Sequence, residues 1–367
     1  MDDVSGIGDT IRVQAVCREF LAARPLEIVP LRDSGFSGSR VYRVRTGGGA
    51  NETLVCKAFA PGVDRGRAEW IHRLMSGLRA AGMTEVPALA ATPAGATIVS
   101  DSRGTHWELL EFRSGKPTDV PTPRQAQAAV ETLARLHVAA SRLPGPKAKP
   151  GPAPAVVRRI RMAERMLSRP WATLDRLCDD LPDRRPGALA VAELRCRLEA
   201  AAAMLKPPGP RVLCWIAGWT APSIGLQPVL RDVWADHVLF ADREERVAGI
   251  IDFHAAAIDT PATDVARLLG SWHPTAPPAS YFGTWAPIIA AYERISALGT
   301  VERKLVPVLA ATGVLFGIDT WFRWLIEEER RFLRPDAVLR RIDRLLEELP
   351  AALDFLADRA GNGGLTG

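Results

Sequence analysis

The feature that most constrains the fold is a short β-rich island inside a mainly helical region. From about residue 113 onward, the spacing of apolar residues is mostly that of amphipathic helices. Strand-like runs interrupt these helices at residues 212–216, 228–231, 238–241 and 247–253. The polar segment 241–246 joins the last two runs, so the sequence predicts a β-hairpin embedded among helices.

Polar residues bracket this hairpin. Asp232 follows the run 228–231, His237 immediately precedes Val238, and Asp252 follows Ile251 at the end of the last run. A hairpin can bring residues just before its first strand close to residues just after its second. Aspartate often caps turns, so each aspartate alone is compatible with a structural role. Two aspartates and a histidine around one hairpin favour a functional site.

The first third of the chain mixes strand and helix patterns. Four strands are predicted at residues 26–33, 40–46, 53–59 and 106–112, with a shorter one at 96–100 and a helix over 64–81. The first two strands are joined by a small polar turn. Its backbone amides can approach phosphate oxygens, because small residues leave them open. The residues concerned are Gly35, Ser37, Gly38 and Ser39.

Lys57 is the one charged residue in the apolar strand 53–59. A buried lysine is costly unless a counter-charge accompanies it. Glu69, in the following helix, is the predicted partner. The alternative is that Lys57 lies on the solvent face of an edge strand.

Composition limits the function classes. A chain of 367 residues predicts two domains or one two-lobed domain, and 47% hydrophobic with 24% charged residues is ordinary for a soluble protein. A net charge of +5 weakly favours anionic ligands and argues against a nucleic-acid partner. The five cysteines show no CxxC spacing, which predicts reduced thiols.

Location is also predicted from the sequence. The N-terminal residues lack the pattern of a secretory signal, and no apolar run approaches ~18 residues. We therefore expect a cytoplasmic protein without a membrane partner. The sequence leaves the oligomeric state open.

Several segments, in this order, resemble the aminoglycoside phosphotransferase / choline kinase-like family. The run 250–253 (IIDF) resembles its metal-binding segment, residues 259–267 resemble its small-residue loop and following helix start, and residues 133–137 resemble the helix end before its catalytic region. The resemblance covers roughly residues 30–272. It implies an α+β, two-lobed, protein-kinase-like fold. A small antiparallel-sheet lobe that binds nucleotide would span residues 1–112, and a larger helical lobe with the catalytic loop and acceptor site would span 113–367.

The resemblance also implies roles for individual residues in an ATP-dependent phosphotransferase. Lys57, held by Glu69, would touch the ATP phosphates beneath the Ser37–Ser39 turn. The segment from Glu108 through Glu111 to Phe112 would be the hinge that takes the adenine edge. Asp232 would act as the base toward a small-molecule hydroxyl acceptor, and Asp252 would hold Mg²⁺ with help from His237.

The sequence departs from the family pattern in the catalytic loop. Leu230 and Arg231 stand where histidine and glycine are expected, and His237 stands where asparagine is expected. Magnesium prefers oxygen ligands, whereas imidazole suits softer ions. His237 could bind Mn²⁺, hold a metal-bound water, leave Asp252 as the main ligand, or coordinate nothing. A nucleotide-binding pseudoenzyme with a regulatory or scaffold role is therefore the alternative to an active enzyme.

The acceptor is less constrained. An aminoglycoside-, choline- or sugar-like molecule would suit aromatic and acidic residues downstream of the hairpin. These residues are Trp272, His273, Tyr281, Trp285, Asp319, Trp321, Trp324, Glu327 and Glu328. Helical spacing allows Phe316, Trp321 and Trp324 to be core residues instead. Asp264 is expected to stabilise the catalytic loop or to cap its own helix.

Overall fold

The computed structural model describes residues 3–21, 25–31, 39–47, 53–60, 62–144, 149–168, 191–206, 208–242, 244–272, 285–332 and 334–362. Its contacts divide the chain into two compact units with interleaved ranges. Unit 1 comprises residues 1–118, 122–145 and 236–256. Unit 2 comprises residues 119–121, 146–235 and 257–367. The hairpin that the sequence predicts therefore belongs to unit 1, although the residues on both sides of it belong to unit 2.

Unit 1 is built on a five-stranded antiparallel sheet of order β1-β2-β3-β5-β4. The strands are β1 (Glu27–Pro30), β2 (Val41–Arg45), β3 (Thr53–Ala58), β4 (Val99–Ser100) and β5 (His106–Glu111). Three helices belong to the same unit: α1 (Asp3–Phe20), α2 (Arg65–Ala80) and α3 (Pro123–Arg142). The turn η1 (Ala235–His237) leads into the hairpin of β9 (Val238–Phe240) and β10 (Val247–Ile250).

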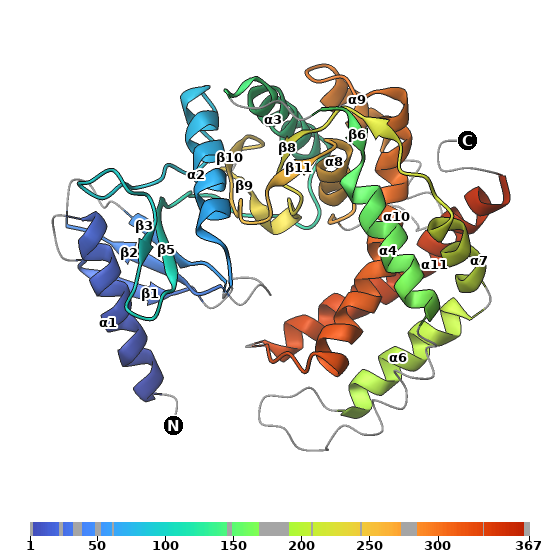
Figure 1. The fold of residues 1–367 in the computed structure, drawn as a ribbon, viewed down its shortest axis with the longest axis horizontal. Helices are drawn as coiled ribbons and strands as arrows, with labels where there is room; N and C mark the ends of the chain where they lie inside the picture. The colour runs from blue at the N-terminus through green and yellow to red at the C-terminus, as the bar shows by residue number, and fades with distance from the viewer. Residues whose placement is uncertain are drawn as a thin grey trace. The chain divides into compact units, whose positions relative to one another are not determined.

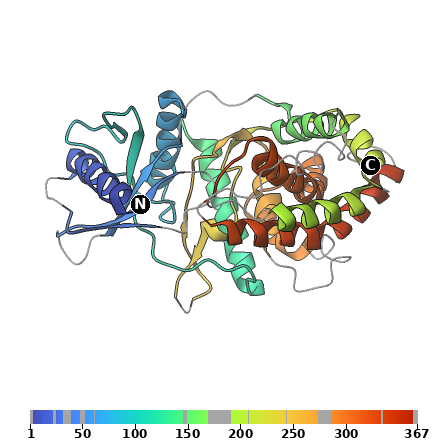
Figure 2. The same cartoon turned by 90° about the horizontal axis from the view of Figure 1, so that it is seen from below.

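Alternation of side chains along the strands gives the sheet two different faces. One face packs on α1, and its core includes Val16, Tyr42, Leu54, Cys56 and Trp107. Figures 1 and 2 show α1 and α2 on opposite sides of the sheet. The other face therefore receives the odd-numbered residues of β3 and the even-numbered residues of β5.

Helix α2 begins at a capping aspartate, Asp64, whose side chain accepts a hydrogen bond from the backbone N–H of Arg67. Its buried residues recur at helical spacing: Ala68, Ile71, His72, Leu74, Met75 and Leu78. Helix α3 begins with a capping box in which Thr122 and Gln125 satisfy each other's backbone N–H groups. Both helices start within one residue of the predicted positions.

Unit 2 is mainly helical. Its helices are α4 (Pro154–Ser168), α6 (Val191–Leu205), α7 (Gly209–Ala217), α8 (Ala262–Leu269), α9 (Ala286–Glu293), α10 (Thr300–Phe322) and α11 (Pro335–Asn362), and a π-helical turn, η3 (Arg323–Glu327), follows α10. Two small antiparallel pairs complete it: β6 (Gly151–Pro152) with β7 (Ser223–Ile224), and β8 (Gln227–Val229) with β11 (Ala257–Asp259). Figure 2 shows α6 running alongside α11, with which it makes contact.

Two expectations change in unit 2. Residues 212–216 are helical, within α7, and not a strand; a short apolar run does not distinguish a buried strand from a buried helix. Residues 300–327 are long and apolar enough to cross a membrane, which the sequence did not predict. In the structure 72% of this apolar window is buried inside the protein, as is typical of a core helix.

The α+β fold predicted from the sequence is confirmed, with an antiparallel sheet in the N-terminal region and a mainly helical remainder. The four cysteines among the described residues, Cys17, Cys56, Cys196 and Cys214, are free, as expected for reduced thiols.

Candidate functional site

Lys57 lies on β3, which is flanked by β2 and β5 in the sheet. Its side chain is on the face opposite the α1 core, and the residue is only 7% exposed. The alternative of a solvent-facing lysine on an edge strand is therefore wrong. The register places Glu108 of β5 directly beside Lys57 on the same face.

The Nζ of Lys57 donates a hydrogen bond to Oδ1 of Asp252 over 2.9 Å. Asp252 follows β10 and has a left-handed backbone, with φ of 61°. Burial acts to raise the pKa of Asp252, but the charges of Lys57, His254 and His237 outweigh it and hold this pKa well below its usual range. The carboxylate is therefore ionised at neutral pH.

His237 ends the turn η1, directly before β9. Antiparallel pairing of β9 and β10 brings it to the residues that follow β10, and Ile251 N–H donates to the His237 carbonyl over 2.9 Å. Its Nε2 lies 4.0 Å from Oδ2 of Asp252. The structure thus brings both predicted metal-site residues together.

Glu69 does not pair with Lys57. Its carboxylate accepts a hydrogen bond from Arg65, one helical turn earlier, and both side chains are about half exposed. Helix α2 instead turns His72 toward the sheet, where the residue is 3% exposed. Lys57 receives its counter-charge from Asp252, a residue distant in sequence.

Glu108 is buried at the centre of this face and contacts two histidines. Oε2 lies 2.7 Å from Nε2 of His72, and Oε1 lies 2.8 Å from Nε2 of His254. Burial acts to raise the pKa of Glu108, but the charge of His254, the bonds from both histidines and the charge of Lys57 lower it to about 2. Its side chain is thus fully engaged within the unit.

Glu111 lies at the end of β5 and is about one-third exposed. It pairs with Arg113 over 2.6 Å and accepts a hydrogen bond from the backbone N–H of Ala88. In the predicted hinge, the N–H of Glu111 donates to Ala88 and that of Phe112 donates to Thr53.

The predicted phosphate-binding turn is described only in part. Gly35, Ser37 and Gly38 lie outside the described residues. Ser39 is described, and it is 9% exposed just before β2.

Asp232 lies in unit 2, where Arg231 before it has a left-handed backbone with φ of 66°. Its Oδ1 accepts hydrogen bonds from Trp234 Nε1 over 2.6 Å and from Arg267 Nη2 over 2.8 Å. The Arg267 guanidinium also lies over the Trp234 ring, 3.5 Å from its centroid. The sequence did not single out Arg267 for this contact.

Asp264, on α8, supports the same loop by bonding its backbone. It is fully buried and accepts hydrogen bonds from the backbone N–H groups of Leu230 over 2.7 Å and of Arg231 over 2.6 Å. The expectation that Asp264 stabilises this loop is confirmed.

The predicted acceptor residues divide into core and partly exposed positions. Phe316 and Trp321 are buried, as the core interpretation expected, and so are Trp272 and Trp285. Trp324 is partly buried, with Arg330 over its ring. Asp319 pairs with Arg165. His273 and Tyr281 lie outside the described residues.

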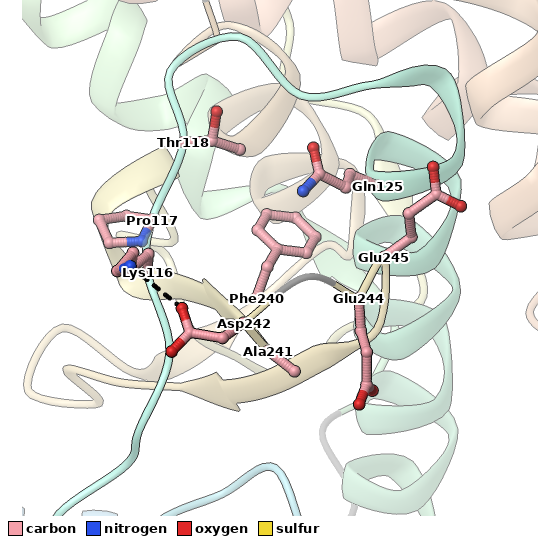
Figure 3. A pocket seen from close by; sticks show the side chains of 9 residues that line it. All are labelled: Lys116, Pro117, Thr118, Gln125, Phe240, Ala241, Asp242, Glu244 and Glu245. Carbon is pink, nitrogen blue, oxygen red and sulfur yellow. Dashed lines mark ion pairs between the residues drawn. The ribbon is translucent and has the colours of Figure 1, made fainter.

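A hollow of about 680 Å³ lies in unit 1. Figure 3 shows its lining, which carries three carboxylates from the β9–β10 turn region and an ion pair between Lys116 and Asp242 over 3.2 Å. Its lining residues include none of those predicted for the nucleotide, the metal or the base.

Comparison with known families places the chain in a family. The model of the family described as "Phosphotransferase enzyme family" matches residues 28–298, well over half of the chain. The chain belongs to the phosphotransferase enzyme family.

Eight curated proteins also match, and all eight are homoserine kinases. The homoserine kinase of Beijerinckia indica subsp. indica is 27% identical over 240 residues, which cover 65% of this chain and 64% of that protein. The chain therefore spans somewhat less than two thirds of that relative's length.

Solved structures share the fold. A spectinomycin phosphotransferase in complex with ADP and spectinomycin gives a TM-score of 0.59 at 10% identity, covering 96% of this chain and 98% of that one. An amicoumacin kinase in complex with AMP-PNP and Ca²⁺ gives 0.58 at 10% identity, covering 95% and 94%. At this identity the likeness shows the fold alone.

The residues of this phosphotransferase-family chain fit a weakly chelated divalent ion. Magnesium in nucleotide sites is commonly held by one or two carboxylates together with phosphates and waters. Asp252 provides one ionised carboxylate, and His237 provides a nitrogen nearby. Within the described ranges, no group of three or more His, Cys, Asp or Glu side chains is placed to hold a metal alone.

Proposed function

We propose that this protein is an ATP-dependent phosphotransferase that moves the γ-phosphate to a hydroxyl of a small molecule. Family membership supports the reaction class. The observation that carries the proposal is the contact between Lys57 and Asp252 in unit 1. We assign Lys57 to the phosphates of ATP and Asp252 to the metal ion.

Phosphoryl transfer depends on positioning and charge neutralisation more than on covalent chemistry. Lys57 would bind the α- and β-phosphates of ATP, and the backbone near Ser37–Ser39 would cover them. Asp252, with His237, would hold a divalent cation, either Mg²⁺ or Mn²⁺. When bound, that cation would neutralise charge on the phosphates. Two solved relatives of the fold hold nucleotides, and one of them also holds Ca²⁺.

Asp232 would orient the acceptor hydroxyl and accept its proton. Arg267 and Trp234 fix one of its oxygens, so the carboxylate has a defined direction. A positioned general base typically accelerates a reaction by about 10²- to 10⁴-fold, and we expect Asp232 to contribute within this range.

Adenine would be held by the segment 108–112. The Glu108 side chain is engaged by two histidines, and the N–H groups of Glu111 and Phe112 already donate within unit 1. The Leu109 carbonyl also accepts a hydrogen bond within unit 1, from the N–H of Ala90. The carbonyl groups at the end of the segment, of Glu111 and Phe112, are therefore the contacts that we assign to adenine.

Homoserine is the first acceptor to test, because the curated relatives are named homoserine kinases. Aminoglycosides and choline-like or sugar-like alcohols form the comparison group. We propose a soluble, cytoplasmic enzyme without nucleic-acid or membrane partners. The described helix that is long and apolar enough to cross a membrane is largely buried inside the protein, which supports the proposal of no membrane partner.

The test is ATP binding and acceptor-dependent ADP release with Mg²⁺ and with Mn²⁺. We expect wild type to bind metal–ATP and to turn over one acceptor, and Asp232→Asn to keep binding while losing at least about 100-fold in kcat. Asp252→Asn should weaken metal-dependent ATP binding. Absence of metal–ATP binding in wild type would refute the proposal.

Two further outcomes separate the enzyme from the pseudoenzyme. Binding without turnover on every acceptor would favour a regulatory role, which the unusual Leu230 and His237 also favour. Higher Mg²⁺-dependent turnover in His237→Asn would show that the histidine selects against Mg²⁺.

A further inference from the structure

A buried row of polar side chains connects α2 and β5 to the residues after Asp252. Thr97 Oγ1 lies 2.8 Å from Nδ1 of His72, and Glu108 bridges His72 to His254. Glu108 is 2% exposed, and each of its carboxylate oxygens contacts one histidine. Because a buried charge is costly when its partners are lost, this bridge fixes the three residues relative to one another.

His254 is also fixed by contacts that do not involve Glu108. Its ring stacks on Phe59, with centroids 4.4 Å apart and planes inclined by 12°. Arg67 of α2 donates from Nη2 to the carbonyl of His254 over 3.2 Å and to that of Ala256 over 3.0 Å. Ring and backbone of this segment are thus attached to α2, to β5 and to the end of β3.

Asp252 needs such support because its backbone is strained. A left-handed conformation in a non-glycine residue is uncommon, although aspartate tolerates it better than most residues. One side of Asp252 is fixed where Ile251 donates to His237. On the other side, the backbone N–H of His254 approaches Oδ1 of Asp252 at 3.4 Å, so the position of His254 bears directly on that carboxylate.

We propose that His254 is a positioning residue for Asp252, anchored by Glu108 and Arg67, and that it holds the Asp252 carboxylate in the orientation in which it can take a metal ion. Glu108 and His72 then link α2 to that orientation, in place of a contact between Glu69 and Lys57. This inference rests on the proposed function, since it assigns Asp252 to a metal–nucleotide complex.

The experiment compares nucleotide affinity with and without metal, measured by calorimetry with ADP in EDTA and in Mn²⁺, together with Mn²⁺ electron paramagnetic resonance. His254→Phe keeps a ring against Phe59 but removes the bond to Glu108. We expect at least a tenfold loss of the Mn²⁺-dependent gain in ADP affinity, with less than a twofold change in EDTA.

Two further variants keep the test decisive if His254→Phe does not fold. His254→Gln retains an N–H that can reach Glu108 and should recover much of the Mn²⁺-dependent gain. Arg67 is exposed, and Arg67→Met removes its hydrogen bonds to the carbonyl groups of His254 and Ala256. We expect this variant to reduce the Mn²⁺-dependent gain in ADP affinity by about two- to fivefold. The matched control is His106→Phe on β5, whose ring contacts Ser100 rather than Glu108.

The inference is overturned if wild type shows a Mn²⁺-dependent gain and both His254→Phe and Arg67→Met keep it, whatever their melting temperatures. A lowered melting temperature with an unchanged gain would mark the bridge as structural only. Absence of metal-dependent nucleotide binding by wild type would instead refute the proposed function, so the two failures are distinguishable.

Discussion

Two loops of this protein carry an aspartate with a proposed role, and each loop contains a residue with a left-handed backbone, but the two loops are supported in different ways. In unit 2 the strained residue is Arg231, just before Asp232, and in unit 1 it is Asp252 itself. Asp264 supports the first loop by accepting hydrogen bonds from two successive backbone N–H groups. The second loop is held mainly by side chains, from Lys57 and through His254.

This difference teaches where each loop is sensitive. Asp264 accepts hydrogen bonds from the backbone and so fixes the path of the main chain. The Asp232 side chain is oriented separately, by Trp234 and Arg267. Side-chain contacts fix the functional carboxylate directly, but they depend on distant elements. We therefore expect one substitution, at Asp264, to destabilise the unit 2 loop. In the unit 1 loop the effect should be divided among substitutions of several side chains.

The largest effect should come from Asp264→Ala, which removes the support of the unit 2 loop. Two charge-assisted hydrogen bonds are lost and buried N–H groups are left unpaired, so we expect the free energy of unfolding to fall by about 3–5 kcal/mol. Urea denaturation measures this change. Asp264→Asn, which keeps one acceptor oxygen, is the matched control and should lose less. A loss below about 1 kcal/mol for Asp264→Ala would show that the loop does not depend on this residue.

Acid should weaken unit 1 through Glu108. Its pKa is lowered to about 2 in the folded protein, against roughly 4.3 in an unfolded chain. A lowered pKa stabilises the fold above the unfolded value, and the stabilisation is lost as pH falls toward the folded value. We expect a loss of about 2–3 kcal/mol between pH 5 and pH 2 from this group.

Glu108→Gln should lack this part of the pH dependence. Asp101 and Asp252, whose pKa values are also lowered, titrate in both proteins. The difference in slope between urea unfolding series at pH 5, 4 and 3 therefore isolates Glu108. Parallel slopes for wild type and variant would contradict the assignment of an ionised, bridging Glu108.

The smallest effect should come from Glu69→Ala, which tests whether α2 reaches the Asp252 loop only through His72 and Arg67. The Glu69–Arg65 pair is exposed, so we expect the free energy of unfolding to change by less than about 0.5 kcal/mol. Metal-dependent ADP affinity should match that of Arg65→Ala and of wild type. A tenfold loss of metal-dependent ADP affinity in Glu69→Ala but not in Arg65→Ala would support the predicted pairing of Glu69 with Lys57.

Much of the fold could be predicted because its elements have strong local signals. The strand over 53–59 ends within one residue of the observed β3, and Thr122 and Pro123 mark the start of α3. The helical α7 was mistaken for a strand because the run 212–216 is uniformly apolar and has no periodicity to separate the two.

The site was predicted in part. His237 and Asp252 could be placed together from the sequence, because hairpin geometry is a local property. The contact between Lys57 and Asp252 was not predicted, because the two residues are 195 positions apart. The Glu108 bridge was missed, because His254 approaches it from 146 positions away. One signal was available: His72 falls among apolar residues at helical spacing on the buried face of α2, whereas Glu69 does not.

The interleaving of the two units has a consequence for the order of synthesis. Lys57 and its partner Asp252 are 195 positions apart, although both belong to unit 1. At typical translation rates, about 10 to 40 seconds separate their emergence from the ribosome. Throughout that interval the residues of the sheet are present without the returning hairpin, and Lys57 is present without the carboxylate that it contacts in the folded protein. Unit 1, which contains the N-terminal sheet, is therefore completed only after most of the chain has been made.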